Sequence, residues 1–300
     1  MKRSFLAVCF GAMFFAACKE VPPDINFGVS AVDTTYMLTS VPAVTAHNVL
    51  IEEFTGQSCS NCPAGHAIVD SDEVHYPGRL NVIALFPHDG SPLTTPSSGA
   101  AYDFTSSVSL NIANTIFGSI PQYPSAGVDR LPYLSSSGLY IADANWTADF
   151  ISRLSQVDSL NMSVSSNYAT VAGVTTATIV ATVTYLQSMT TQQNLSVVVV
   201  ADSMSDIQEF PFGTDTPDYV FNSVFVGMVS AVPYGDQLID SITLKAPGRF
   251  VQSVYKYTLP ATFSKGAVNP AHCRVIAFVN GPGTSGNYQV YQSVQAPLGP

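Results

Sequence analysis

The stretch that decides the fold runs from Ile51 to His66 and reads IEEFTGQSCSNCPAGH. It carries a C-x-x-C motif formed by Cys59 and Cys62. The β-branched, aliphatic and aromatic residues at 49–54 predict a short strand, and residues 55–58 predict a turn. Residues 63–69 predict a helix, and Pro63 is compatible with it because a proline is tolerated in the first helical turn. The two cysteines are therefore expected at the N-terminus of a helix that follows a strand.

Strand, turn, C-x-x-C and helix in this order resemble the active site of a thioredoxin-like domain. Free amides and the helix dipole stabilise a thiolate at a helix N-terminus, so Cys59 would be the attacking sulfur and Cys62 the resolving one. The resemblance implies that Glu53, which precedes Cys59 by six positions, is the buried acid that takes a proton from Cys62. It also implies a cis-proline facing the disulfide, for which Pro124 is the first choice and Pro121 the competitor.

Three further segments complete the predicted thioredoxin-like domain, which we place at residues 47–157. Residues 80–86 predict a buried strand, because they form a continuous, mostly apolar run. Residues 98–117 predict a helix inserted before the proline segment, and residues 146–154 predict an amphipathic closing helix.

Two interpretations of the cysteine pair stay open, catalytic thiol exchange and a static disulfide. An exposed Cys59 sulfur beside a cis Pro124 would favour the first, and a disulfide covered by the inserted helix would favour the second. Zinc binding by Cys59, Cys62 and His66 lacks a further ligand, and haem attachment needs a histidine directly after the motif, where Pro63 stands. We therefore expect neither a metal nor a cofactor.

The N-terminus predicts export and lipid anchoring. Lys2 and Arg3 precede an apolar run at 4–15, which is too short to cross a bilayer as a helix. The small residues at 16–17 lead into Cys18, as in a bacterial lipobox, so we expect residues 1–17 to be a signal peptide and Cys18 to be lipidated. Residues 18–46 would form a tether. The acidic Glu20 after the cysteine slightly favours the outer face of the outer membrane over the periplasmic face.

Composition narrows the class of partner. The chain has 11 basic and 21 acidic residues, and removal of Lys2 and Arg3 leaves 9 basic residues and a net charge of −12. An acidic chain without a basic cluster argues against nucleic acid and against an electrostatic membrane surface as the partner. Charged residues make up only 11% of the chain, which suits an extracellular β-rich protein.

The second half, residues 158–300, predicts an all-β, antiparallel, sandwich-like domain. Alternating or continuous apolar segments recur between Gly, Pro and Asn residues, as at 162–166, 176–185, 195–200, 241–244, 250–259, 274–279 and 288–294. Residues 219–228 fit a helix or a strand equally well. Cys273 opens one of the apolar segments and is expected to be a buried, inert thiol. This half carries no catalytic constellation.

The order of these features resembles the Omp28-related lipoproteins of Bacteroidetes over nearly the whole chain. The run from Glu52 to His66 is the specific part of the resemblance, and the segments at 123–130, 218–222 and 275–279 are looser matches. That family usually carries a His and an Arg after the position of Tyr219, where Phe221 and Val226 stand here. The resemblance implies an outer-membrane lipoprotein with a thioredoxin-like domain and a β-rich C-terminal domain.

A short pattern also resembles the O-glycosylation acceptor of exported Bacteroidetes proteins. It is an Asp followed by Ser or Thr and then an aliphatic residue, Met or Thr, and its acceptors would be Thr34, Ser159, Ser203 and Ser241.

Two functions follow from these expectations. The first is a surface-anchored binding, adhesion or scaffold protein with a structural disulfide and an unknown protein partner. The second is a membrane-tethered thiol-disulfide oxidoreductase that acts on exported proteins, with Cys59, Cys62, Glu53 and Pro124 as its site.

Overall fold

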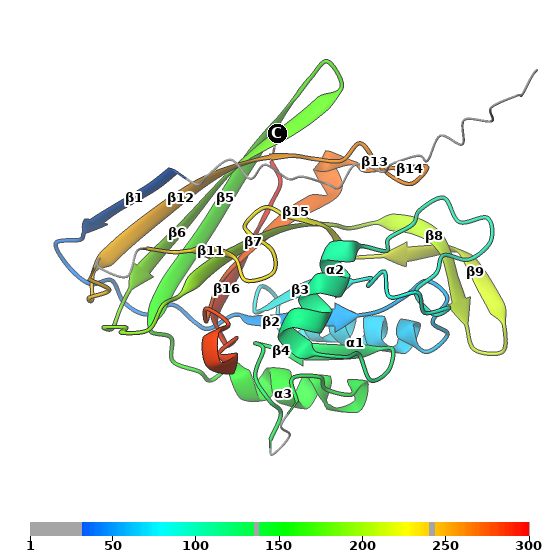
Figure 1. The fold of residues 1–300 in the computed structure, drawn as a ribbon, viewed down its shortest axis with the longest axis horizontal. Helices are drawn as coiled ribbons and strands as arrows, with labels where there is room; N and C mark the ends of the chain where they lie inside the picture. Colours follow the sequence, from blue (N-terminus) through cyan, green and yellow to red (C-terminus); the bar gives the residue numbers. More distant parts are fainter. Residues whose placement is uncertain (1–31, 135–137, 240–243, 300) are drawn as a thin grey trace, which may run out of the picture.

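A computed structural model describes residues 32–134, 138–239 and 244–299, and its main body consists of two sheets (Figure 1). The smaller sheet has four antiparallel strands, in the order β1 (Val32–Met37), β12 (Arg249–Thr258), β6 (Val174–Tyr185) and β5 (Leu160–Val171). The larger sheet has eight strands of mixed direction, in the order β16 (Val290–Pro297), β15 (Cys273–Asn280), β7 (Asn194–Ala201), β10 (Val224–Met228), β3 (Leu80–Leu85), β2 (Val49–Phe54) and β4 (Ser125–Val128), with β11 (Asp236–Gln237) paired to β7.

Three helices lie against the larger sheet. They are α1 (Cys62–His75), α2 (Ser107–Ile112), which continues as a π-helical turn over Ala113–Phe117, and α3 (Trp146–Arg153). Short 3₁₀ turns occur at Asp143–Asn145, Pro270–His272 and Thr284–Gly286. Two small hairpins, β8 (Met204–Phe210) with β9 (Thr214–Phe221) and β13 (Thr262–Phe263) with β14 (Gly266–Ala267), stand apart from the two sheets. No helix of the described residues is long and apolar enough to cross a membrane.

The larger sheet continues from the N-terminal half into the C-terminal half. All residues of β3 are buried, so this strand needs a neighbour on each side as well as cover on both faces. It pairs in parallel with β2 on one side and with β10 on the other. Strands from both sides of the predicted boundary at 157/158 therefore share one sheet.

Three hydrophobic clusters fill the spaces around this sheet. The largest lies between the two sheets and includes Ile179, Val183 and Val199. A second packs α1 and α3 against β2 and β3 through Val69, Trp146 and Phe150. The third packs α2 and the π-helical turn against strand residues that point to the opposite face of the sheet from those in the second cluster, such as Leu50 and Phe54. Since successive strand residues face opposite sides, α2 covers one face of the sheet and α1 with α3 cover the other.

A buried polar cluster joins distant segments of the fold. His47 lies between two carboxylates, with its Nδ1 2.8 Å from Asp158 and its Nε2 2.9 Å from Asp129. The amide of Gln292 on β16 also donates to Asp158. The side chains of His47, Asp129 and Asp158 have no exposed surface. The cluster ties the chain before β2 to the segments that precede β5 and follow β4.

Most predicted elements occur, one begins later than expected, and the segment predicted at 241–244 lies mostly outside the described residues. The helix predicted at 98–117 begins only at Ser107, because the hydroxyl of Ser106 caps it by accepting from the amides of Val108 and Ser109. The ambiguous segment at 219–228 lies in strands, the end of β9 and all of β10. Cys273 is 1% exposed, and burial raises the pKa of its thiol to about 12.

Candidate functional site

The cysteine pair forms a disulfide at the start of α1. The two Cα atoms are 5.3 Å apart, as a disulfide requires. β2 ends at Phe54, a turn follows, and Cys62 is the first residue of α1, with Pro63 in the first turn. Cys59 is 1% exposed and Cys62 is fully buried, so neither sulfur is open to a partner in this conformation.

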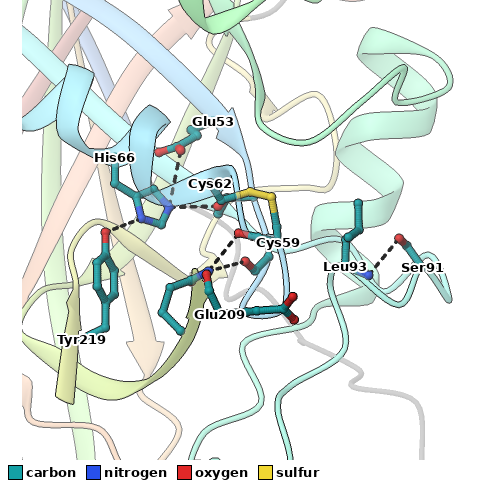
Figure 2. The surroundings of a disulfide bond; sticks show 11 residues. Glu53, Cys59, Cys62, His66, Ser91, Leu93, Glu209 and Tyr219 are labelled. Carbon is teal, nitrogen blue, oxygen red and sulfur yellow. Dashed lines mark hydrogen bonds and ion pairs between the residues drawn. A yellow bond between two sulfur atoms is a disulfide. The ribbon is translucent and has the colours of Figure 1, made fainter. Parts of the chain in front are cut away.

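The β8–β9 hairpin packs against the backbone of the loop that carries the disulfide (Figure 2). The side-chain amide of Gln208 on β8 donates to the backbone carbonyl of Cys59 at 3.0 Å. The next residue, Glu209, donates from its backbone amide to the carbonyl of Gln57 at 2.9 Å. Gln208 is itself fully buried, so the hairpin is held against the disulfide loop by bonds that water does not reach.

The loop that contains Leu93 also contacts the turn before Cys59. The backbone amide of Ser58 donates to the carbonyl of Leu93 at 3.1 Å. A Cβ atom on Gly56 would lie 2.3 Å from that same carbonyl oxygen, so only glycine permits this approach. Cover by the inserted helix, α2, would have favoured a static disulfide, but these contacts come from the hairpin and the loop.

Glu53 lies on β2 beneath the first turns of α1. It is 1% exposed, and burial, reinforced by the charge of Asp70, raises the pKa of its carboxyl to about 8. A Cβ atom on Gly65 would lie 3.1 Å from its Oε1, which shows how closely α1 passes over it. The predicted buried acid is therefore present at the base of this helix.

His66 links Glu53 to the hairpin (Figure 2). Its Nε2 lies 3.5 Å from Oε1 of Glu53 and 2.8 Å from the hydroxyl of Thr55. Its Nδ1 lies 2.7 Å from the hydroxyl of Tyr219 on β9. Burial lowers the pKa of His66 to about 4. At neutral pH the imidazole is therefore neutral and faces a carboxyl that is largely protonated.

A small cavity of about 20 Å³ adjoins this group. Its polar lining includes Glu53, His66, Asp70, Glu73 and Tyr219, and its apolar lining includes Val82 and Phe86. A space of this size holds about one water molecule. Cys59 and Cys62 do not line the cavity, so it leads to Glu53 and not directly to the sulfurs.

The peptide bond between Tyr123 and Pro124 is cis, as predicted for the proline that faces the disulfide. Pro124 directly precedes β4, whose Ser125 pairs with Phe54 at the end of β2. The hydroxyl of Tyr123 donates to Asp89 at 2.7 Å. The proline is thus held at the end of β2 from which the cysteine loop departs.

The other predicted site residues are scattered. Thr34 and Ser203 are exposed and Ser159 is half-buried, while Ser241 and Cys18 lie outside the described residues. The described residues contain no cluster of His, Cys, Asp and Glu side chains suited to a metal ion.

Sequence reasoning missed the cover of the disulfide. Gln208 stands in no local motif, and Tyr219 lies in the 218–222 segment without any sign that it contacts the cysteine helix; both lie on the paired strands β8 and β9. His66 did stand inside the decisive stretch, but its partner Tyr219 lies 153 positions away.

The comparisons with known proteins identify the fold and leave the family open. No protein-family model matches the chain, and no curated protein matches it. The structure of HBP35 of Porphyromonas gingivalis is similar, with a TM-score of 0.61 and 18% sequence identity over 86% of this chain and 77% of that one. A crystal structure of an Agrobacterium tumefaciens protein also aligns, with a TM-score of 0.43 and 14% identity over 86% of this chain and 97% of that one. The chain therefore shares its fold with HBP35.

Proposed function

We propose that this chain is an exported lipoprotein of the Omp28-related type, anchored in the outer membrane through Cys18. In this proposal a thioredoxin-like domain holds a structural disulfide, and the protein serves as a surface-exposed binding or scaffold module. Its partner would be another protein, since the acidic chain does not suit nucleic acid.

The main support for a structural role is that the disulfide is buried. Thiol-disulfide exchange needs a thiolate to reach a disulfide sulfur, and it slows when access is blocked. Cys59 is 1% exposed, and Gln208 holds the hairpin over its backbone. The pair therefore acts as a covalent staple at the point where β2, α1 and the β8–β9 hairpin meet.

The arrangement of β2, α1, β3 and β4 supports a thioredoxin-like assignment for the N-terminal part. β2 and β3 run parallel, β4 pairs antiparallel with β2, and helices cover both faces. The cysteines stand at the start of α1, and the cis Pro124 stands at the start of β4.

Metabolic labelling with a radioactive fatty acid tests the anchor. Wild-type cells should incorporate label into the protein and retain it in the outer-membrane fraction, and Cys18→Ser should abolish both. Cys9→Ser is the matched control, because Cys9 would leave with the signal peptide. Equal labelling of the Cys18→Ser variant and the wild type would refute the anchor. Degradation by protease added to intact cells would support display on the outer face.

A second function, thiol-disulfide oxidoreductase, is favoured by Glu53 and the cis Pro124. Reduced Cys59 would attack a client disulfide as a thiolate and release one client thiolate. Cys62, deprotonated by Glu53, would then attack the mixed disulfide and release the second, so the client is reduced and the pair is oxidised. Pro124 would receive the client backbone. Reduction of insulin by dithiothreitol, accelerated by wild-type protein but not by Cys59→Ser, would support this function; no acceleration would argue against it.

A further inference from the structure

We propose that a second cavity, on the α2 side of the larger sheet, binds a neutral sugar that carries an acetamido group. The proposal goes beyond both functions above, because neither cysteine lines this cavity. Its volume is about 350 Å³, and sites for small molecules usually measure about 300–1,000 Å³. The size suits a compact ligand built around a sugar ring.

Four segments of the chain meet around this cavity. They are the π-helical turn after α2, the residues after β4, the stretch before α3 and the approach to β16, which contribute Ile116 and Phe117, residues 130–132, 138–139 and 286–289. The cavity therefore lies where the N-terminal and C-terminal halves of the chain come together, a common place for a ligand site.

Arg130 supplies an unused hydrogen-bond donor to the cavity wall. Its Nε and Nη2 each donate to the carboxylate of Glu52 at 2.7 Å, whereas its Nη1 is buried without a hydrogen-bond partner. Because the guanidinium is planar with three nitrogens around one carbon, Nη1 points away from Glu52. A buried donor without a partner is unfavourable, and Arg130 lines the cavity, so a ligand oxygen can supply what Nη1 lacks. Nη1 is covered in this conformation, so the ligand reaches it with a small shift of the lining side chains.

The ion pair decides the charge of the ligand. The side chains of Glu52 and Arg130 are 2% and 1% exposed, so the carboxylate already balances the buried guanidinium. A carboxylate or phosphate on the ligand would compete with Glu52 and add an uncompensated negative charge to a buried site, which is unfavourable. An uncharged carbonyl oxygen accepts from Nη1 without adding charge.

An acetamido group combines this carbonyl with a methyl group. Ile116 and Phe117 are 4% and 9% exposed and give the cavity apolar surface on which the methyl group can pack. A purely apolar ligand would leave Nη1 of Arg130 without a partner, so it fits less well.

Tyr288 and two amides match the sugar ring. The ring of Tyr288 lies parallel to that of Tyr234, with the ring centres 6.2 Å apart and an interplanar angle of 6°. Its hydroxyl donates to the backbone carbonyl of Thr115 at 3.3 Å, so the aromatic face is held in place at the cavity. The apolar side of a sugar ring can pack on such a face. The side-chain amides of Asn287 and Gln289, which also line the cavity, can donate to and accept from its hydroxyl groups.

The test compares two sugars on the purified chain, by saturation-transfer NMR and calorimetric titration. N-acetylglucosamine should bind about tenfold more tightly than glucose, because glucose has no carbonyl for Nη1. This comparison leaves Arg130 and its ion pair intact, so it does not depend on whether an Arg130 variant folds. Equal affinities for the two sugars, or no binding of N-acetylglucosamine at millimolar concentration, would overturn the proposal.

Variants locate the site. Leu139→Trp should abolish binding, because Leu139 is a half-buried lining residue and the larger ring fills the cavity. Tyr288→Ala should weaken binding about tenfold through the loss of the aromatic face. Tyr36→Ala is the matched control, since Tyr36 lies exposed on β1 and does not line the cavity. Circular dichroism confirms that each variant is folded. Undiminished binding in Leu139→Trp would place the sugar elsewhere and refute the proposal. None of these results bears on the lipid anchor or on the role of the disulfide.

Discussion

The side-chain amide of Gln208 lies 3.0 Å from the backbone carbonyl of Cys59, a residue 149 positions earlier in the chain. The same amide also lies 2.9 Å from the carbonyl of Glu209. One buried side chain thus joins the disulfide loop to the hairpin that covers it. The relationship fixes the hairpin against the backbone of a C-x-x-C loop whose two cysteines are at most 1% exposed.

Replacing Gln208 with Ala should loosen this cover. Buried carbonyls would lose their donor, which costs about 1–3 kcal/mol of the free energy of unfolding. The disulfide should also react faster with dithiothreitol, because the hairpin opens more often. Urea unfolding and the rate of reduction check both effects. Gln187→Ala, at an exposed position after β6, should leave both unchanged. An unaltered reduction rate in Gln208→Ala would show that the hairpin does not limit access.

His47 should make stability depend on pH above neutrality. Burial alone would lower its pKa, but the hydrogen bonds that its ring donates to the carboxylates of Asp129 and Asp158, together with their charges, outweigh burial and raise it from 6.5 to about 9. Its contribution is therefore complete below pH 6.5 and is lost as the pH rises through 9. A shift of this size corresponds to roughly 3 kcal/mol.

Urea unfolding between pH 6 and 9.5 measures this loss. His47→Gln should lower stability at pH 6 and flatten the pH dependence above it. His272→Gln, at an exposed position, should follow the wild-type curve. A wild-type slope in His47→Gln would assign the pH dependence to another group.

The pair of Glu52 and Arg130 should show strong coupling. Two hydrogen bonds of 2.7 Å join the side chains, which are 2% and 1% exposed, and the guanidinium lies 5.0 Å from the ring centre of Phe278. Arg130→Met leaves a buried carboxylate unpaired and should cost about 3–5 kcal/mol. The double variant with Glu52→Leu should recover most of that loss. Additive losses in a double-mutant cycle would contradict the coupling.

Gly65→Ala should destabilise the protein although alanine favours helices. The new Cβ atom would lie 3.0 Å from two ring atoms of Trp146 and 3.1 Å from Oε1 of Glu53. Trp146 is fully buried and cannot move away, so overpacking of about 1–3 kcal/mol exceeds the gain in helix propensity of about 1 kcal/mol. Thermal unfolding checks this, with Val74→Ala at the exposed end of α1 as a neutral control. A higher melting temperature for Gly65→Ala would refute it.

Local patterns predicted the elements around the cysteines. The strand, turn and helix from Val49 to Val69 follow from residue type and spacing alone. The disulfide between Cys59 and Cys62 was expected because export to an oxidising compartment favours pairing of the two thiols. The cis peptide bond at Pro124 was predicted only through the thioredoxin resemblance, because no local property of the sequence selects it over Pro121.

Long-range contacts escaped the same reasoning. The sequence of β10 is a short apolar run, and its periodicity does not indicate which strand it pairs with. The same run would fit a strand of a separate sandwich or, as observed, a neighbour of β3. The cluster of His47, Asp129 and Asp158 joins residues 82 and 111 positions apart, and each looks like an ordinary polar residue in its own segment. Enclosure of the disulfide also depends on a hairpin that lies about 150 positions away in the sequence.

The reduction potential of the Cys59–Cys62 pair tests the central claim most directly. The purified chain would be equilibrated with thiol buffers of known potential, and the reduced fraction read by mass spectrometry after alkylation, with Cys59→Ser to identify the signal. An enclosed structural disulfide predicts a value below about −300 mV. A value between about −120 and −270 mV, the range of working thiol-disulfide oxidoreductases, would contradict a structural role and favour the enzyme.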